Sequence, residues 1–509
     1  MNAATAPKLE SLPDDPAVLK SIIADQARWI ERLKHELFRL RRWQFGTKAE
    51  RLPEGQQIFD FYGTLEEERK KAEEKAASGP PPPPRGPRQG HGRRVIPPEL
   101  PRREVVHDVP ESDRKCDECG EVMVEFGRDV SEQLEYQPCQ IYVIQNVYPK
   151  YACKNKACGM GPVAQAPAET IPVGRGLAGP GLMAHVLVSK YDDHLPLYRQ
   201  SEIFGRQGLD LPRSTLGLWV GEAVELLRPL VGAMKEDILQ SKVICTDDTP
   251  VRVLDPGAGR AHQGRFWAYL GDRAHRQVVF EFTMTREQKW AKEFLGDYAG
   301  YLQADAFKGY DQLFKEGRIL EVACWAHGRR YFFEAQETDR ERALWALGQI
   351  GLLYDIEREA KERALKPDEV RALRQERARP ILERIRDWLE REAPRVLPKS
   401  PMGQAIHYAR SQWKALQVYL QDGNLSIDNN AVENILRGVA VGRKNWLFLG
   451  SEGGGEWAAV LYSLIESCKL HGVNPWLYLK DVLVRVSTHP SRRILELTPR
   501  LWKPPPDSS

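Results

Sequence analysis

Three acidic residues far apart in the chain stand where their carboxylates could hold metal ions. Asp247 closes a strand-like apolar run, VICTDD, and Asp305 closes another, YLQAD, so both can project from one edge of a sheet. Glu433 lies on a helix predicted to begin near Asp428, which can act as its N-cap. Gathered carboxylates repel one another, and Mg²⁺ or Mn²⁺ removes the conflict. The pattern predicts a two-metal-ion site that activates an attacking oxygen and stabilises a leaving oxygen at a phosphate.

The segment that carries Glu433 has two faces at helical spacing. Asn429, Glu433 and Arg437 line up at four-residue steps and should look toward the strand ends. The opposite, apolar face should pack on the sheet and consists of Val432, Ile435, Leu436 and Val439. Basic residues beside the acids, Arg437, Arg443 and Lys444, are predicted to hold a DNA backbone. An Asp at a strand end is usually a turn or cap residue, so each acid carries weight only within the whole pattern.

Four of the eight cysteines form two close pairs around a strand-rich stretch, residues 130–153. Cys116 and Cys119 form one pair, and Cys153 and Cys158 form the other. Four thiolates on two turns suit one structural, tetrahedral Zn²⁺, whereas reduced surface cysteines are the alternative. The remaining four are expected to be ordinary buried residues, namely Cys139, Cys245, Cys324 and Cys468.

The charge of the chain is balanced overall but uneven along its length. Lys and Arg total 74 against 71 Asp and Glu. Basic residues gather at 28–51 and 85–103, which predicts contacts with phosphates, including contacts from Arg41, Arg42 and Lys48. Sparse cysteines, the lack of a membrane-length apolar run and the lack of a signal-like start predict a cytoplasmic protein.

A chain of 509 residues is long enough for several folded units. Apolar residues at heptad-like steps predict a helix over about 16–43, which could self-associate or pack within its own chain. We predict a basic, coiled-coil-like N-terminal helical region (1–63), a Pro/Arg-rich linker (64–105), a zinc ribbon (106–170) and a helical DNA-binding block (171–240). An α/β core follows in two parts (241–335 and 426–455), interrupted by a helical insertion (336–425) and followed by a C-terminal helical region (456–509).

The helical block contains a segment with the pattern of a helix-turn-helix, residues 195–220. It predicts a helix, a turn at Gly208 and a second helix capped at Ser214, with Arg213 as a DNA contact. An ordinary pair of helices in a bundle is the alternative. Further along, Trp446 and Phe448 could stack on an unpaired base, although core packing is the favoured interpretation.

Most of the chain, from about Leu40 to Leu483, resembles transposases of the insertion sequence 66 family. The resemblance lies in LRRWQFGTKAERL, SEQLEYQP between the cysteine pairs, the 195–220 segment, TDDTPV, QADAFKGYDQL, CWAHGRRYFFEA and IDNNAVENILRGVAVGRKNWLFLGSEGGGE. It implies a ribonuclease-H-like catalytic fold in which Asp247, Asp305 and Glu433 match an Asp, Asp, Glu triad. The family's usual Glu after the first Asp is Asp248 here, so either adjacent acid could reach the metal.

The resemblance also implies an activity and partners. It implies cleavage at the terminal inverted repeats of a bacterial mobile element and joining to target DNA, by a homo-oligomer, at least a dimer, that acts at the nucleoid and can need accessory proteins. The motif with His327, Arg329 and Arg330 is implied to contact DNA or stabilise the site, whereas a helix start with surface arginines is the alternative.

Two other functions would use parts of the same pattern. One is a catalytically inactive DNA-binding regulator derived from a transposase, which the retention of all three acids disfavours. The other is a sugar hydrolase with paired carboxylates. That reaction would leave the basic stretches and the cysteine pairs without a role.

Overall fold

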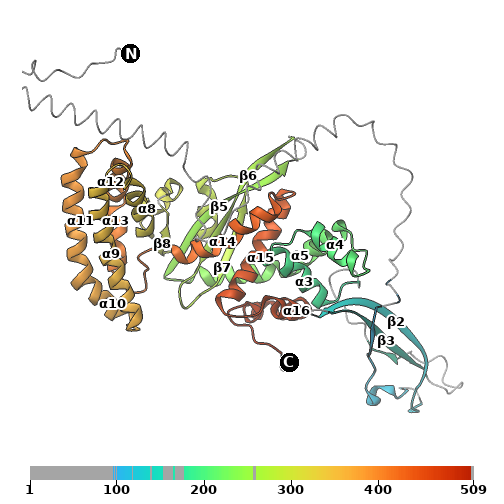
Figure 1. Cartoon of the computed structure of the whole chain (residues 1–509). Helices are drawn as coiled ribbons and strands as arrows, with labels where there is room; N and C mark the ends of the chain where they lie inside the picture. Colours follow the sequence, from blue (N-terminus) through green and yellow to red (C-terminus); the bar gives the residue numbers. More distant parts are fainter. Residues whose placement is uncertain are drawn as a thin grey trace, which may run out of the picture.

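The computed structural model describes residues 96, 98 and 100–505, with gaps at 117–118, 138–139, 153–163, 167–176, 256–258 and 306 (Figure 1). The predicted N-terminal helix and most of the linker lie outside the described residues. So do several residues singled out above, namely Arg41, Arg42, Lys48, Cys139, Cys153 and Cys158. Among the described residues, none of the helices is both long and apolar enough to span a membrane.

A five-stranded mixed sheet forms the centre of the molecule, and its strand order is β7-β6-β5-β8-β9. The strands are β5 (Val243–Asp255), β6 (Arg260–Leu270), β7 (Val278–Thr283), β8 (Gly300–Ala304) and β9 (Ile319–Ala323). β5, β6 and β7 are antiparallel neighbours, whereas β8 pairs parallel to β5 and β9 parallel to β8. The two apolar runs that lead to Asp247 and Asp305 lie in β5 and β8, and the predicted mixture of helices and strands in this part of the chain is confirmed.

The prediction that Asp247 ends its strand is wrong. β5 continues to Asp255, because it pairs with β6 over its whole second half. Its parallel neighbour β8, in contrast, pairs with β5 only as far as Cys245. Asp247 therefore lies just beyond the end of β8, beside Asp305, which directly follows that strand.

Two helices from the C-terminal part of the chain cover the sheet (Figure 1). α14 (Asn430–Trp446) packs on β5 and β6, and α15 (Glu452–Leu470) packs on β7. The predicted apolar stripe of α14 is buried, as expected. The N-cap of α14 is Asn429 and not Asp428, because the Asp428 carboxylate instead accepts from the backbone and side-chain N–H groups of Asn430.

A helical block lies beside α15 and consists of α3 (Pro180–Tyr191), α4 (Leu197–Arg206), α5 (Arg213–Ile238) and α16 (Pro475–Arg485). The turn predicted at Gly208 is present, and this glycine has a positive φ of 83°. The predicted cap at Ser214 is wrong. The N-cap is Pro212, two residues earlier, its backbone is extended, and no side chain caps the helix.

The predicted insertion is helical, and its buried side chains form one cluster with residues of β5 and β9. After α8 (Trp325–Ala335) it comprises α9 (Arg340–Glu362), α10 (Pro367–Leu373), α11 (Arg379–Glu392), α12 (Pro401–Ser411) and α13 (Trp413–Gln417). Its two connections to the sheet meet, because Trp325 N donates to Ile427 O at 3.1 Å.

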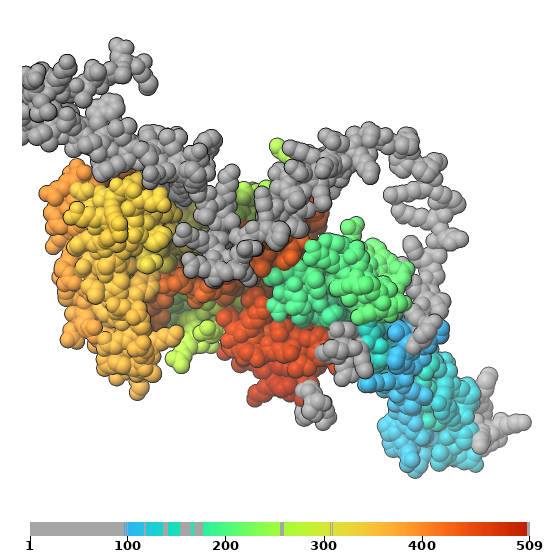
Figure 2. All heavy atoms as spheres, viewed as in Figure 1, coloured from blue at the N-terminus to red at the C-terminus, as the bar shows by residue number. Residues whose placement is uncertain are grey.

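A second sheet contains β1 (Arg102–Val106), β2 (Val124–Gln137), β3 (Gln140–Ala152) and β4 (Ala164–Gln165). β2 and β3 form the hairpin predicted behind the first cysteine pair. Figure 2 shows this sheet, in blue, at one end of the molecule and the helical insertion, in yellow and orange, at the other. The central sheet and its covering helices lie between them (Figure 1).

Candidate active site

Neighbouring strands bring two of the three predicted acids together. Asp247 on β5 and Asp305 after β8 each offer a carboxylate oxygen to one group with Asp248, in which all three oxygens lie within 4.8 Å of one another. Because β5 and β8 run parallel at this point, both acids emerge at one edge of the sheet. The predicted convergence of the two aspartates is therefore seen in the fold.

Asn429 joins α14, which carries the third acid, to the same edge. Its side chain is fully buried, and its Nδ2 donates to the backbone carbonyl of Thr246 at 2.9 Å. Its backbone N–H points to Cys324 Sγ at 3.2 Å. The first turn of α14 is thereby held against β5 and the start of α8.

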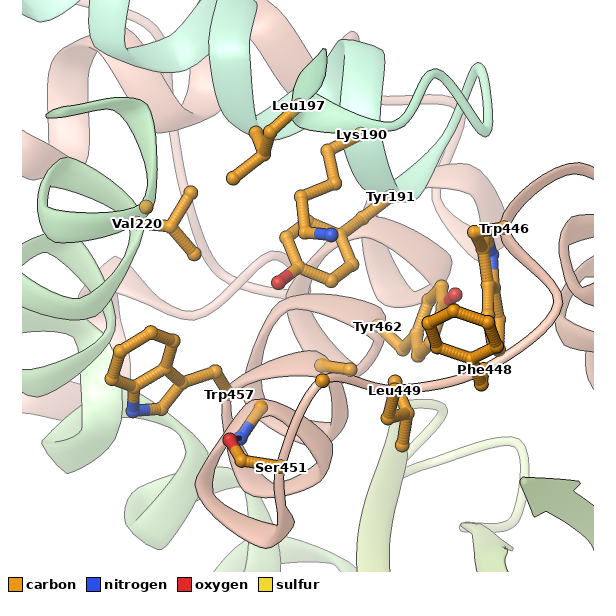
Figure 3. Close-up of a pocket in the computed structure, with 14 residues that line it drawn as sticks. Lys190, Tyr191, Leu197, Val220, Trp446, Phe448, Leu449, Ser451, Trp457 and Tyr462 are labelled. Atoms are coloured by element: carbon orange, nitrogen blue, oxygen red, sulfur yellow. Dashed lines mark hydrogen bonds between the residues drawn. The ribbon is translucent and has the colours of Figure 1, made fainter. Parts of the chain in front are cut away.

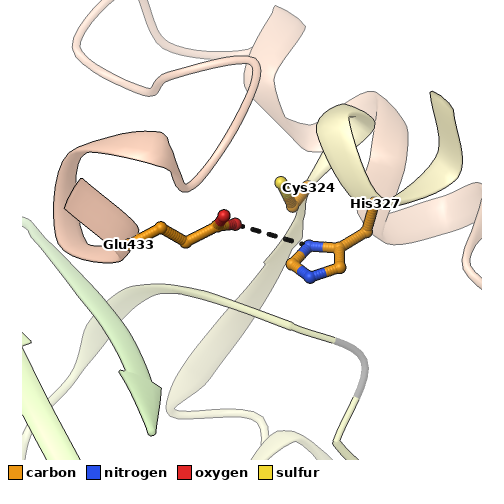
Figure 4. Close-up of side chains that lie close together, drawn as sticks. All are labelled: Cys324, His327 and Glu433. Atoms are coloured by element: carbon orange, nitrogen blue, oxygen red, sulfur yellow. Dashed lines mark ion pairs between the residues drawn. The ribbon is translucent and has the colours of Figure 1, made fainter. Parts of the chain in front are cut away.

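Glu433 lies one turn into α14, in a group separate from the aspartates, with Cys324 and His327 (Figure 4). Its Oε1 is 3.7 Å from His327 Nδ1, and its Oε2 is 3.9 Å from Arg330 Nη2. Cys324 completes the group, because its sulfur, a ring nitrogen of His327 and a Glu433 oxygen lie within 4.8 Å of one another. The charge of Glu433 also acts on Asp247, whose pKa it helps to raise.

Burial and mutual repulsion govern the ionisation of the aspartates. Burial is the largest cause that raises the pKa of Asp247, to about 7, and the Asp305 charge adds to it. Burial also raises the pKa of Asp305. In both cases, the surrounding protein groups do not offset the cost of burying the negative charge.

Several buried polar atoms at this edge have no hydrogen-bond partner among the described residues. They are Asp305 Oδ1, His327 Nδ1, Asn429 Oδ1 and Glu433 Oε1. Buried polar atoms are costly unless something satisfies them. Carboxylate and amide oxygens are hard ligands, so this set fits a divalent cation such as Mg²⁺.

Asp248 differs from its neighbour, because arginines occupy its carboxylate. Arg265 donates to its Oδ2, and Arg286 donates twice to its Oδ1, at 2.6 and 3.0 Å. The side chain of Asp248 is only 1% exposed. Arg286 also reaches Asp305 Oδ2 at 3.3 Å and stacks over Phe307. The carboxylate of Asp248 is therefore paired with two arginines. Asp247, in contrast, interacts with the charges of Asp305 and Glu433.

The predicted DNA contacts are distributed over three helices. Arg437 and Lys444 are exposed on α14, Arg329 and Arg330 are exposed at the start of α8, and Arg213 is exposed as the first residue of α5. Arg443 is half-buried and donates to the backbone carbonyl of Pro250, so it fastens α14 to β5.

The preference for core packing of Trp446 and Phe448 is wrong for the second residue. Trp446 is partly buried against the core, whereas Phe448 is 44% exposed. Leu447, between them, has a positive φ of 61° and ends α14, so Phe448 lies outside the helix, next to Leu449, which pairs with β5.

Three residues near the acids were missed or underestimated from the sequence. Cys324 is fully buried, as expected, but it belongs to the Glu433 group. Its three-residue spacing to His327 at a helix start is a signal that could have suggested this. Arg286 and the structural role of Asn429 carried no local signal, because both act on partners distant in sequence.

In the turn before β2, Cys116 is buried and Cys119 is half-buried. Cys116 packs with Met123 and Tyr151 at the base of the β2–β3 hairpin, and Cys119 lies against this cluster. The first pair thus occupies the position that a zinc ribbon requires, a turn beside a hairpin.

Comparisons with known proteins cover nearly the whole chain. The family described as "Transposase IS66 family" matches residues 175–457, and "IS66 C-terminal element" matches residues 463–500. "Zinc-finger binding domain of transposase IS66" matches residues 113–155, and "Transposase C of IS166 homeodomain" matches residues 32–105.

Similar proteins include three from Sinorhizobium fredii (strain NBRC 101917 / NGR234), all of them called uncharacterized. The protein y4jD is 33% identical over 97% of this chain and 98% of its own length. The protein y4hP is 32% identical over 81% of this chain and 77% of its own. The protein y4qI is 31% identical over 99% of this chain and 94% of its own.

Proposed function

The chain belongs to the IS66 transposase family, and from this premise we propose that it cuts the ends of its mobile element and joins them to target DNA. The observation that carries the proposal is the edge of β5 and β8, where Asp247 and Asp305 come together and where Asp305 and Glu433 each have a buried carboxylate oxygen without a hydrogen-bond partner among the described residues. The strand order, three antiparallel strands followed by two parallel ones, supports a ribonuclease-H-like core.

Asp247, Asp305 and Glu433 would hold two divalent cations, Mg²⁺ or Mn²⁺. When bound, such ions activate the attacking oxygen and stabilise the leaving oxygen of an in-line phosphoryl transfer. Water first breaks the P–O3′ bond at the element's end. The resulting 3′-hydroxyl then attacks a phosphate of the target and displaces a 3′-oxygen there, so no covalent intermediate with the protein is required.

The chain's other groups would orient the acids and the DNA. His327 and Arg330 hold Glu433, while Asp248 fixes Arg286 beside Asp305. Arg437 and Lys444 lie exposed along the same helix as Glu433, where they can bind the phosphates of the strand that is cut.

The DNA-binding parts flank this core. We propose that Cys116, Cys119, Cys153 and Cys158 bind one structural Zn²⁺, in keeping with the family's zinc finger. With the α4–α5 pair and the basic N-terminal region, this ribbon would grip the terminal repeats of the bacterial element's DNA. We also propose that the domains have the boundaries predicted from the sequence. The protein would act as at least a dimer, together with accessory proteins.

The test incubates the full chain and Mg²⁺ with the DNA that flanks its own gene, and maps the cleaved ends. Replacement of Asp247, Asp305 or Glu433 by Ala should abolish cleavage and leave binding to the terminal DNA intact. A matched control is Asp355→Ala, because Asp355 is exposed on α9 of the insertion. Undiminished cleavage by any of the three variants would contradict the assignment. Binding without cleavage by the unchanged protein and its accessory proteins would favour the inactive regulator.

A further inference from the structure

A pocket of about 240 Å³ lies at the opposite end of α14 from Glu433 (Figure 3). It is bounded by the ends of α3 and α14, the start of α15 and one face of the α4–α5 pair. Figure 3 shows Trp446 and Phe448 on one side of the pocket and Trp457 on the other. Its aromatic lining consists of Tyr191, Trp446, Phe448, Trp457 and Tyr462.

The pocket also carries features that suit an anion. Lys190 extends into it, and its Nζ lies 5.0 Å from the centre of the Tyr191 ring (Figure 3). Gly450, Ser451 and Gly454 line the pocket at the N-terminus of α15, where Ser451 is the N-cap. The N–H of Gly454 already donates to Ser451 Oγ, so this end favours negative charge through the dipole of α15. The aromatic side chains suit the base of a nucleotide, whereas Lys190 and the helix N-terminus suit its phosphate.

Two basic residues follow Glu433 along α14 toward the end of the helix that borders the pocket. Arg437 and Lys444 follow Glu433 by 4 and 11 residues, spacings that place all three on one face of α14. Trp446 follows Glu433 by 13 residues, which corresponds to about 20 Å along the helix. Trp446 itself lies on the opposite face of α14, so a DNA strand bound along the basic face would enter the pocket by passing around the C-terminal end of the helix, where Phe448 is exposed.

We propose that the pocket takes one unstacked nucleotide of the element's DNA end, with its base against Phe448 and Trp446 and its phosphate toward Lys190. This inference rests on the proposed function, because it needs DNA along α14. Every base has a π face, so aromatic walls can accept an unpaired base of any sequence. A hydrophobic peptide would fill the walls but leave Lys190 and the start of α15 without a counterpart. Binding of one nucleotide in the pocket would fix the distance along the DNA between that nucleotide and the phosphate that is cleaved.

The test places the fluorescent base 2-aminopurine at successive positions of the terminal DNA, bound to the full chain without divalent metal. One position, or two adjacent ones, should change fluorescence on binding. Phe448→Ala should abolish that change and weaken binding of the DNA about tenfold, the scale of one lost stacking contact. Phe448→Trp should retain both. Leu344→Ala is the matched control, because Leu344 is 49% exposed on α9, in the insertion.

Two results would overturn the inference. One is a bound DNA in which no position responds, and the other is a response that is unchanged in Phe448→Ala. Cleavage of the same DNA with Mg²⁺ is measured in parallel. DNA that is cut without any fluorescence response refutes the pocket alone, whereas DNA that responds but is never cut refutes the proposed chemistry alone.

Discussion

Asn429 donates its side-chain amide to the backbone carbonyl of Thr246 at 2.9 Å, across 183 residues of sequence. Thr246 directly precedes Asp247, and Glu433 lies one turn after Asn429. This hydrogen bond therefore fixes the helix of the third acid against the strand of the first. It is buried, so no water can take over the role of the amide.

Asn429→Ala should accordingly lower the cleavage rate about 10- to 100-fold, as seen when groups that orient metal ligands are removed. It should also reduce the free energy of unfolding by about 1 to 3 kcal/mol, because Thr246 O loses its buried partner. Cleavage assays and denaturant melts check both effects. Asn434→Ala, at an exposed position of the same helix, is the control. Equal rates for the two variants would argue against the role of Asn429.

The ionisation of Asp247 predicts how stability depends on pH. Its pKa is raised from 3.8 to about 7, mainly by burial and then by Asp305, so the folded protein holds this proton more tightly than the unfolded chain. Between about pH 4 and pH 7, stability should therefore fall as pH rises, by on the order of 2 to 4 kcal/mol from this group. Mg²⁺ should reverse the loss, because it binds the deprotonated carboxylates.

Asp247→Asn removes this titration. Without metal, the variant should melt at a higher temperature than the unchanged protein at pH 8 and at a similar temperature at pH 4. The comparison uses thermal melts at both pH values with and without Mg²⁺. A stability difference between the two proteins that stays constant with pH would show that Asp247 does not titrate in this range.

Asp248 should matter through its arginines. Asp248→Ala leaves Arg265 and Arg286 without their shared carboxylate, and we expect cleavage to fall at least about tenfold because Arg286 is no longer held beside Asp305. Asp248→Glu, the residue usual in the family, should keep most of the activity. The cleavage rate at saturating Mg²⁺ and the Mg²⁺ concentration for half-maximal rate separate the two effects. Loss of metal binding in both variants would instead make Asp248 a ligand.

His327 should act by positioning Glu433. The 3.7 Å approach of its Nδ1 to Glu433 Oε1 predicts that His327→Ala slows cleavage about 10- to 100-fold and shifts its Mg²⁺ dependence. The affinity for terminal DNA should stay within about twofold of that of the unchanged protein. His327 contacts the Glu433 carboxylate and is not one of the exposed residues that we propose as DNA contacts. His407→Ala, in the insertion, is the control. A large loss of DNA affinity with an unchanged Mg²⁺ dependence would make His327 a DNA contact.

Much of the fold could be predicted because its signals are local. The apolar runs before Asp247 and Asp305 predicted β5 and β8, and helical spacing predicted the buried stripe of α14. The length of β5 could not be predicted, because its second half is a strand only through pairing with β6.

The limits at the site have the same origin. Asp247 and Asp305 could be placed together because residues after parallel strands share an edge. The capture of Asp248 by Arg286, the anchor at Asn429 and the exposure of Phe448 all depend on approaches between distant segments. Composition and spacing do not encode those approaches.

The hydrogen bond between Trp325 and Ile427 means that the two ends of a segment of about a hundred residues lie next to each other at the core. The apolar interior of this segment continues onto the sheet, because it forms one cluster with Val322 and Ala323 of β9, and α13 packs on that strand. A lineage could therefore lengthen or shorten the outer ends of these helices while the strands and α14 keep their places, provided that the side chains facing β9 are kept.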